Sequence, residues 1–239
     1  MPLHIGLLTF PRVQQLDLTG PYEVFATLPD TQLHLIWKTL TPITTATGLI
    51  LTPTTTITDC PQLDIICIPG GVGINALLTD ETILAFVKTQ ANTARYITSV
   101  CTGALLLGAA GLLAGKRATT HWSALDLLAR LGATPVKARV VRDGNIVTGG
   151  GVTAGIDFAL TLAAELAGQS AAETIQLSLE YAPEPPFNAG TPETAPPEVL
   201  AATRALGAAS RAEREAIIER STPGHPPRNE STPPQFARP

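Results

Sequence analysis

Charged side chains are scarce in this sequence. They make up 15% of its 239 residues, the formal net charge is −4, and Lys and Arg form no run longer than Lys116-Arg117. A nucleic-acid-binding surface normally shows a basic excess on some segment. The composition therefore argues against a nucleic-acid partner and favours a small-molecule substrate.

Cysteine is rare as well, and no apolar run is long. Cys60, Cys67 and Cys101 are too few and too irregularly spaced for a disulfide framework or a zinc site, so we expect no metal. The longest apolar run, residues 103–115, is shorter than the roughly 20 residues that a membrane-spanning helix needs. The first ten residues lack the basic start and apolar core of a signal peptide. We expect a soluble, cytoplasmic protein that does not bind a membrane.

The sequence does contain a regular alternation of short apolar runs and longer helical patterns. It predicts an α/β fold with a mostly parallel sheet sandwiched between helices, a flavodoxin-like arrangement of three layers. Such sheets place their sites at the carboxyl ends of the strands, here the loops after Thr9, Ile68 and Val100. We expect strands at 3–9, 33–38, 64–68 and 96–100, hairpins through Gly48 and Asp143-Gly144, and helices at 18–28, 80–91, 102–113, 122–131, 153–167 and 171–180.

The composition changes after Tyr181, and twelve of the 21 prolines lie from Pro183 onward. We expect a compact domain over residues 1–181, followed by an arm and one further helix over 182–220. The helix is expected at 197–220 and carries balanced charge. The Pro-rich segment 221–239 is expected to be disordered.

Cys101 stands where an apolar strand pattern stops and an apolar helical pattern begins. Gly103 is small enough for the helix to pack close to the strand, which is the arrangement of a nucleophile elbow with cysteine in the serine position. Free backbone N–H groups and the positive helix end would lower the pKa of the thiol. The alternative is a buried, inert cysteine. Cys67, in the middle of a strand, is expected in the core, and Cys60 has no assigned role.

Two further segments fit such a site. The glycine-rich turn 68–73 follows a parallel strand and could present backbone N–H groups to an oxyanion, although it could also be only a tight turn. Asp17 lies between Leu16 and Leu18 in the loop after the first strand. Partial burial would raise its pKa and suit proton delivery, whereas the alternative is a helix cap. Glu23 is expected to be solvated.

His121 is the histidine that the order of elements brings nearest to this edge of the sheet. It could line the pocket, or it could simply cap the helix expected near Trp122. The remaining glycine-rich stretch, 148–155, is interpreted as close packing. We expect Gly70, Val72, His121 and Trp122 to contribute to the substrate pocket.

These stretches together resemble the ThiJ/PfpI superfamily, whose fold is class I glutamine amidotransferase-like. The resemblance covers about residues 3–200 and rests on Ser99-Val-Cys-Thr-Gly-Ala, Thr120-His-Trp, Asp143-Gly-Asn-Ile-Val-Thr-Gly-Gly-Gly and Gly155-Ile-Asp-Phe-Ala-Leu. It implies a Cys101 nucleophile hydrogen-bonded to Asp17, an oxyanion site formed by the backbone N–H groups of Gly71 and Thr102, and a homodimer.

Two departures from the superfamily's sequence patterns argue against two of its activities. Peptidase-like members have a histidine directly after the cysteine, where this chain has Thr102, and the amidotransferases need a late His-x-Glu pair, which is absent between His121 and His225. The segments 16–25 and 179–190 resemble the isonitrile hydratase subgroup. This resemblance implies a hydro-lyase that forms an N-substituted formamide through a Cys101 thioimidate, with Asp17 as general acid and no cofactor.

Two alternatives remain open. One is a glyoxalase-like or deglycase-like enzyme of the same superfamily, using the same cysteine and acid. The other is a non-catalytic ligand sensor, because the N-terminal domains of some AraC-type regulators are similar. Those regulators continue into basic helix-turn-helix units, which have no obvious counterpart after residue 190.

Overall fold

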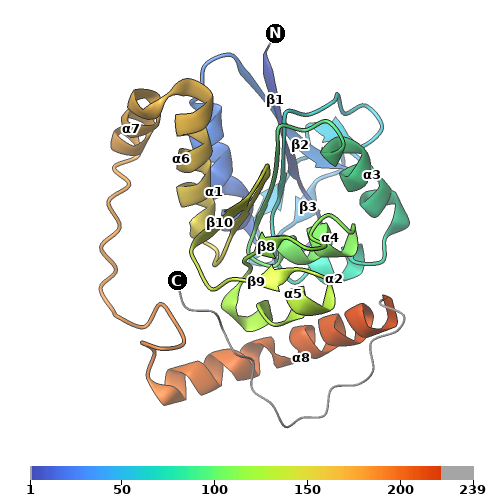
Figure 1. Ribbon diagram of the computed structural model, residues 1–239, viewed down its shortest axis with the longest axis vertical. Coiled ribbons are helices and arrows are strands. Elements are labelled where there is room, and N and C mark those ends of the chain that lie inside the picture. Colours follow the sequence, from blue (N-terminus) through green and yellow to red (C-terminus); the bar gives the residue numbers. More distant parts are fainter. Residues whose placement is uncertain (1, 222–239) are drawn as a thin grey trace.

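A mostly parallel sheet forms the centre of the molecule in the computed structural model, which describes residues 2–221 (Figure 1). Its seven strands have the order β10-β11-β7-β6-β1-β2-β5, and all neighbours run parallel except β10 and β11. The strands of this sheet are β1 (Leu3–Leu8), β2 (Thr31–Trp37), β5 (Thr55–Thr56), β6 (Ile65–Ile68), β7 (Tyr96–Val100), β10 (Val140–Asp143) and β11 (Ile146–Gly149).

The central strands β1, β6 and β7 are buried along most of their length because helices cover the sheet on both sides. On β6 all four residues are buried, and Ile66 pairs with Gly6 of β1 on one side and with Ile97 of β7 on the other. The expected three-layer α/β fold is confirmed.

Helices α1 (Gln15–Ala26), α6 (Ala154–Ala167) and α7 (Gln169–Ser178) lie on one face of the sheet, and α3 (Glu81–Ala91) and α4 (Gly103–Ala109) lie on the other (Figure 1). Each face has its own apolar core. In the first, Phe25 of α1 meets Phe158 of α6 edge to face, with ring centroids 6.2 Å apart. The second core gathers the leucines of α4 against Ile83 and Val87 of α3.

Both predicted hairpins are present. The strands β3 (Ile43–Thr44) and β4 (Ile50–Leu51) pair antiparallel around Gly48, which has a φ of 92°. β10 and β11 pair antiparallel around Asp143-Gly144, where the φ of Gly144 is 64°. Glycine adopts this left-handed backbone without the steric cost that other residues meet. A further short pair is β8 (Arg117–Ala118) and β9 (Thr134–Pro135).

Several helix boundaries differ from the expectation, and α7 begins and ends two residues earlier than predicted. α1 begins at Gln15 rather than Leu18, so Asp17 lies in its first turn and not in a loop. α4 ends at Ala109 rather than at residue 113, because the chain turns through Gly111 with a φ of 77°. The segment expected as one helix at 122–131 consists of a 3-10 turn, η1 (Trp122–Ala124), and a short helix, α5 (Leu127–Arg130).

The last described helix, α8 (Pro197–Ser221), confirms the predicted helix to within one residue. It follows a segment, 179–196, without helix or strand, and it runs across the carboxyl edge of the sheet (Figure 1). There it contacts α5, η1 and the short helix α2 (Ile74–Leu77). The expected disordered tail, 221–239, lies outside the described residues except for Ser221. Within residues 2–221, no helix has the length and apolar character that crossing a membrane requires.

Candidate active site

Cys101 occupies the sharp turn between β7 and α4. Its φ of 54° is in the left-handed region, which is rare for a residue with a side chain and is a mark of the nucleophile elbow. The turn is held on both sides: the Cys101 N–H donates to the carbonyl of Gly149 at 3.0 Å, and the Thr120 hydroxyl donates to the Cys101 carbonyl at 2.6 Å. The elbow expected from the sequence is therefore present, with a side chain that is 6% exposed.

Asp17 lies beside this cysteine and is completely buried. Its Oδ2 accepts the N–H of Gly70 at 2.8 Å, and the carboxyl also interacts with the Cys101 side chain. Among the described residues, no other polar group reaches its second oxygen, Oδ1. The alternative interpretation of Asp17 as a helix cap is wrong: the cap position belongs to Gln14, and the Asp17 carboxyl is turned toward the turn at Gly70.

Burial governs the protonation of both groups. It raises the pKa of Asp17 to about 7, against the opposing effects of the Gly70 N–H and the Cys101 side chain. Burial also raises the pKa of the Cys101 thiol well above its usual value; the charge of Asp17 adds to this, whereas the Thr102 N–H opposes it. At pH values between the pKa of Asp17 and that of Cys101, the pair holds a single proton and a single negative charge.

The sequence predicted that the helix end would lower the pKa of Cys101, and this prediction is wrong for the net effect. The Thr102 N–H does act in the expected direction. However, α4 is only seven residues long, and the sulfur is enclosed by apolar side chains of the core. The thiol therefore does not ionise independently: Cys101 and Asp17 are coupled, and together they hold one proton.

The glycine turn after β6 packs closely against the elbow. A Cβ atom on Gly70 would come within 2.6 Å of both the N and Oγ1 atoms of Thr102 and within 2.9 Å of Asp17 Oδ2, so only glycine fits there. The Gly71 N–H donates to Thr102 Oγ1 at 3.0 Å. Of the two expected oxyanion donors, the Gly71 N–H is therefore already hydrogen-bonded to the Thr102 hydroxyl. The Thr102 N–H faces the sulfur of Cys101.

A pocket of about 780 Å³ opens onto Cys101. Of the residues expected to line it, Val72, His121 and Trp122 do so, together with Gly71 and Thr102, whereas Gly70 does not because its N–H points to Asp17. The opposite wall comes from α8, which contributes Thr203, Arg204, Leu206, Gly207, Ala208, Ser210, Arg211, Ala212, Arg214 and Glu215.

His121 both caps a helix and lines the pocket. Its Nδ1 accepts the N–H of Ser123 at 3.3 Å and lies 2.8 Å from the Ser123 hydroxyl, which fixes the ring at the start of η1. Burial and then the charge of Arg214 lower the pKa of His121. The imidazole is thus neutral at physiological pH, and it forms a polar part of the wall.

The sequence did not point to α8 as part of the site. Arg211 fastens this helix to η1 and α5 through the Ser123 carbonyl and the Asp126 carboxylate, the latter at 2.7 Å. Arg214 is buried within the same contact and lines the pocket. The only available signal was the spacing of Ser210, Arg214 and Ile218, one helical turn apart, which places a polar pair on the same face as an apolar residue.

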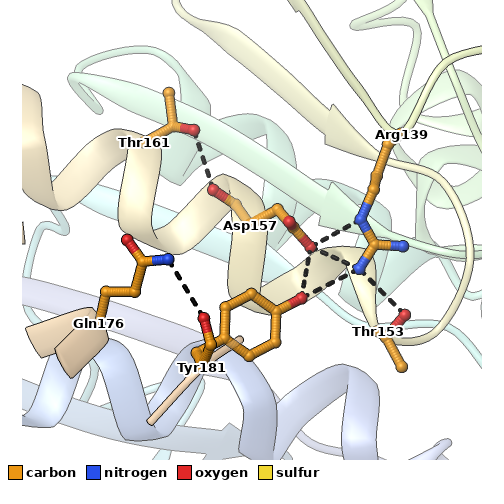
Figure 2. A network of polar contacts seen from close by, with 6 residues as sticks. All are labelled: Arg139, Thr153, Asp157, Thr161, Gln176 and Tyr181. Carbon is orange, nitrogen blue, oxygen red and sulfur yellow. Dashed lines mark hydrogen bonds and ion pairs between the residues drawn. The ribbon is translucent and has the colours of Figure 1, made fainter. Parts of the chain in front are cut away.

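A polar network joins the start of α6 to Arg139 and Tyr181 (Figure 2). Arg139 donates to Asp157 Oδ2 at 2.8 Å and to the Tyr181 hydroxyl at 3.1 Å, and this hydroxyl donates to Asp157 at 3.0 Å. Thr153 accepts from the same guanidinium at 3.1 Å. The network anchors the helix next to Val152, which lines the pocket. Among residues 2–221, no group of three or more His, Cys, Asp or Glu side chains is arranged to hold a metal ion.

Comparison with known proteins assigns a family. The profile of the DJ-1/PfpI family matches residues 4–165. The chain is 63% identical over 221 residues to an isonitrile hydratase of Pseudomonas putida, covering 92% of this chain and 97% of that protein. It is 31% identical over 172 residues to the HTH-type transcriptional regulator GbdR of Pseudomonas aeruginosa, covering 67% of this chain but 46% of the regulator.

The solved structures agree. A ThiJ/PfpI family protein from Pseudomonas syringae superimposes with a TM-score of 0.88 at 45% identity, covering 91% of both chains. The predicted resemblance to this superfamily is therefore confirmed, and it extends over most of the described chain. The chain belongs to the DJ-1/PfpI family.

Proposed function

We propose that this protein hydrates an isonitrile to the corresponding N-substituted formamide. The observation that carries the proposal is the buried Cys101–Asp17 pair with one proton at the base of a largely apolar pocket. The similarity to the isonitrile hydratase of Pseudomonas putida supports it. An isonitrile carbon has to gain both a nucleophile and a proton, which is what this pair holds.

The chemistry balances with these two groups and water. The Cys101 thiolate forms a bond to the terminal carbon of the isonitrile, and Asp17 transfers its proton to the same carbon, which leaves a thioimidate and a carboxylate. The carboxylate then takes a proton from water as the water oxygen adds to that carbon. Asp17 passes this proton to the nitrogen, and the hydroxyl proton of the adduct returns to Asp17 as the thiolate leaves, which releases the formamide and restores the single proton of the pair.

Thr102 and the neutral His121 are proposed to position these groups. The hydroxyl of Thr102 fixes the turn at Gly71, and the Thr102 N–H stabilises the sulfur when it is anionic. The Gly71 N–H would join it as an oxyanion donor once the Thr102 hydroxyl rotates away. The pocket residues Val72 and Trp122 would enclose the isonitrile substituent.

The test is formation of formamide from cyclohexyl isocyanide, followed by chromatography. We expect turnover by the unaltered protein and loss of at least about 10³-fold in Cys101→Ala, since covalent catalysis then disappears. Cys60→Ala is the matched control, because Cys60 is half-buried and outside the pocket. Absence of formamide, or full activity in Cys101→Ala, would refute the proposal. Turnover of methylglyoxal without turnover of the isonitrile would favour a glyoxalase-like activity.

We further propose that the protein acts in the cytoplasm as a homodimer, with residues 1–181 as the catalytic domain and 182–220 as an arm and helix that complete it. The pocket wall contributed by α8 supports this division. Light scattering coupled to size exclusion should give twice the chain mass of 25.0 kDa. A single-chain mass at micromolar concentration would contradict the dimer.

A further inference from the structure

Arg214 is a buried cation in the wall of the pocket that contains Cys101. Its side chain projects from α8, and the residue is only 5% exposed. Burial lowers the pKa of this guanidinium, which shows how unfavourable the location is for a positive charge. A buried charge of this kind requires a partner of opposite sign.

The hydrogen-bond partners of Arg214 are neutral. Its Nε donates to Asn75 Oδ1 at 2.9 Å, and its Nη2 lies 3.4 Å from the Ser210 hydroxyl. No hydrogen bond to Nη1 is present among residues 2–221, and this nitrogen is not sealed from solvent. The nearby Glu213 accepts the amide of Asn75 at 2.7 Å and forms no ion pair with Arg214, although its charge and that of Glu215 favour the charged guanidinium.

The two carboxylates that line the pocket are already paired, and Arg204, the other cation beside Arg211, is exposed. Asp126 and Glu215 both bind Arg211, at 2.7 and 2.6 Å. His121, on the facing loop, is neutral because burial and Arg214 itself lower its pKa. Within the described chain, no carboxylate lies within ion-pair distance of Arg214.

The remaining negative charge is that of the Cys101–Asp17 pair. Cys101 and Arg214 line the same pocket, and each acts electrostatically on the other: the thiolate favours the charged guanidinium, and the guanidinium favours the thiolate. We propose that Arg214 is the counter-ion of this pair, a positioning residue that holds the Cys101 sulfur in its anionic, nucleophilic form. Opposite charges attract strongly across such a poorly solvated space.

The proposal rests on the nucleophilic role of Cys101, and its test needs no isonitrile. The rate of alkylation of Cys101 by iodoacetamide, measured against pH in a Cys60→Ala background, reports the fraction of thiolate. In Arg214→Gln, we expect the rising limb to move to higher pH by about one unit, which lowers the rate at neutral pH about tenfold. Arg214→Lys keeps the charge and should keep most of the rate.

Arg220→Gln is the charge-matched control. It removes the same charge from the same helix, but Arg220 is exposed and does not line the pocket. We expect its alkylation profile to match that of the unaltered protein. Thermal melts of every variant establish that α8 remains folded and docked.

A second variant avoids the loss of the guanidinium altogether. The exchange Asn75→Asp with Glu213→Gln keeps the total charge and moves a carboxylate onto Arg214, because Asn75 Oδ1 already accepts from its Nε. With its charge satisfied locally, Arg214 should no longer favour the thiolate, and the alkylation profile should move in the same direction as in Arg214→Gln. An unchanged profile in this folded variant, or equal shifts in Arg214→Gln and Arg214→Lys, would overturn the proposal even if isonitrile turnover is confirmed.

Discussion

Asp17 accepts the backbone N–H of Gly70 through Oδ2, and this single bond orients its carboxyl toward Cys101. The donor and acceptor come from different segments, the turn after β6 and the first turn of α1. Oδ2 is thus fixed by the backbone, whereas Oδ1 is buried without a hydrogen-bond partner among the described residues. The acid and the nucleophile are positioned independently by two strand ends of one sheet.

The shared proton predicts a bell-shaped pH profile for kcat/KM. Below about pH 7 the pair gains a second proton, because burial raises the pKa of Asp17 to about 7, and it loses the single negative charge that the reaction needs. Far above the usual thiol range, near pH 8.5, the pair loses its last proton, and Asp17 no longer protonates the substrate carbon. Initial rates from pH 5 to 10 check this. A rising limb near pH 4 would contradict the raised pKa.

Asp17→Asn should abolish turnover and stabilise the fold at alkaline pH. Between about pH 4 and 7 the folded protein binds more protons than the unfolded chain, because the Asp17 pKa is raised from 3.8 to about 7, so the free energy of unfolding falls as pH rises. Asparagine removes this loss, and we expect a gain of at least about 1 kcal/mol at pH 8 in urea unfolding. Glu23→Gln, at an exposed position on the same helix, should keep the original pH dependence.

Thr102→Val should leave the Gly71 N–H without its present partner. Loss of the 3.0 Å hydrogen bond in this buried turn should cost about 1–3 kcal/mol of stability and lower kcat, whereas Thr102→Ser retains the hydroxyl and should lose much less. Denaturant unfolding and isonitrile kinetics on both variants separate the hydroxyl from the methyl group. Equal behaviour of the two variants would show that the hydrogen bond is unimportant.

Gly70→Ala should disrupt the active site. The added Cβ would lie 2.6 Å from the backbone nitrogen of Thr102, so the elbow or Asp17 must move. We expect a loss of more than about tenfold in kcat/KM, because small displacements of reacting groups are costly. Gly190→Ala is the control, since a Cβ there meets nothing within 4 Å.

The network in Figure 2 should stabilise the fold without taking part in the reaction. Tyr181→Phe removes the hydroxyl that bridges Arg139 and Asp157, and we expect a loss of about 0.5–1.5 kcal/mol with kcat reduced less than about threefold. Tyr96→Phe is a comparison on the surface, where the hydroxyl contacts Glu165. A large fall in kcat with unchanged stability would place Tyr181 in the catalytic step instead.

The nucleophile and its strand could be predicted from sequence because the signals are local. β7 was predicted at its observed bounds, and the abrupt change from an apolar strand to a small-residue helix marked Cys101 as the elbow. The two hairpins were also predicted correctly, since glycines at Gly48 and Gly144 supply the backbone that such turns require.

The remaining parts of the site depend on contacts between distant segments. The start of α1 was misplaced because Gln14, not a typical capping residue, precedes it, and its backbone is held by the carbonyl of Gly70. The pKa of Cys101 was predicted in the wrong direction because its burial results from the packing of the core on the side of the sheet covered by α1 and α6. For Arg214 the helical spacing with Ser210 and Ile218 was too weak a signal to mark the site, since its partner Asn75 lies in a different part of the chain.

The pocket wall opposite Cys101 is formed by α8, the last described helix, whereas Cys101 itself lies in the middle of the chain. During synthesis, the sheet and its elbow therefore emerge well before α8 does. A partly made chain would present a thiol without its enclosing wall or its guanidinium neighbour, and so without the environment that makes the sulfur selective. We therefore expect the thiol to acquire its pocket wall and its proposed counter-ion, Arg214, only when this helix docks, late in folding.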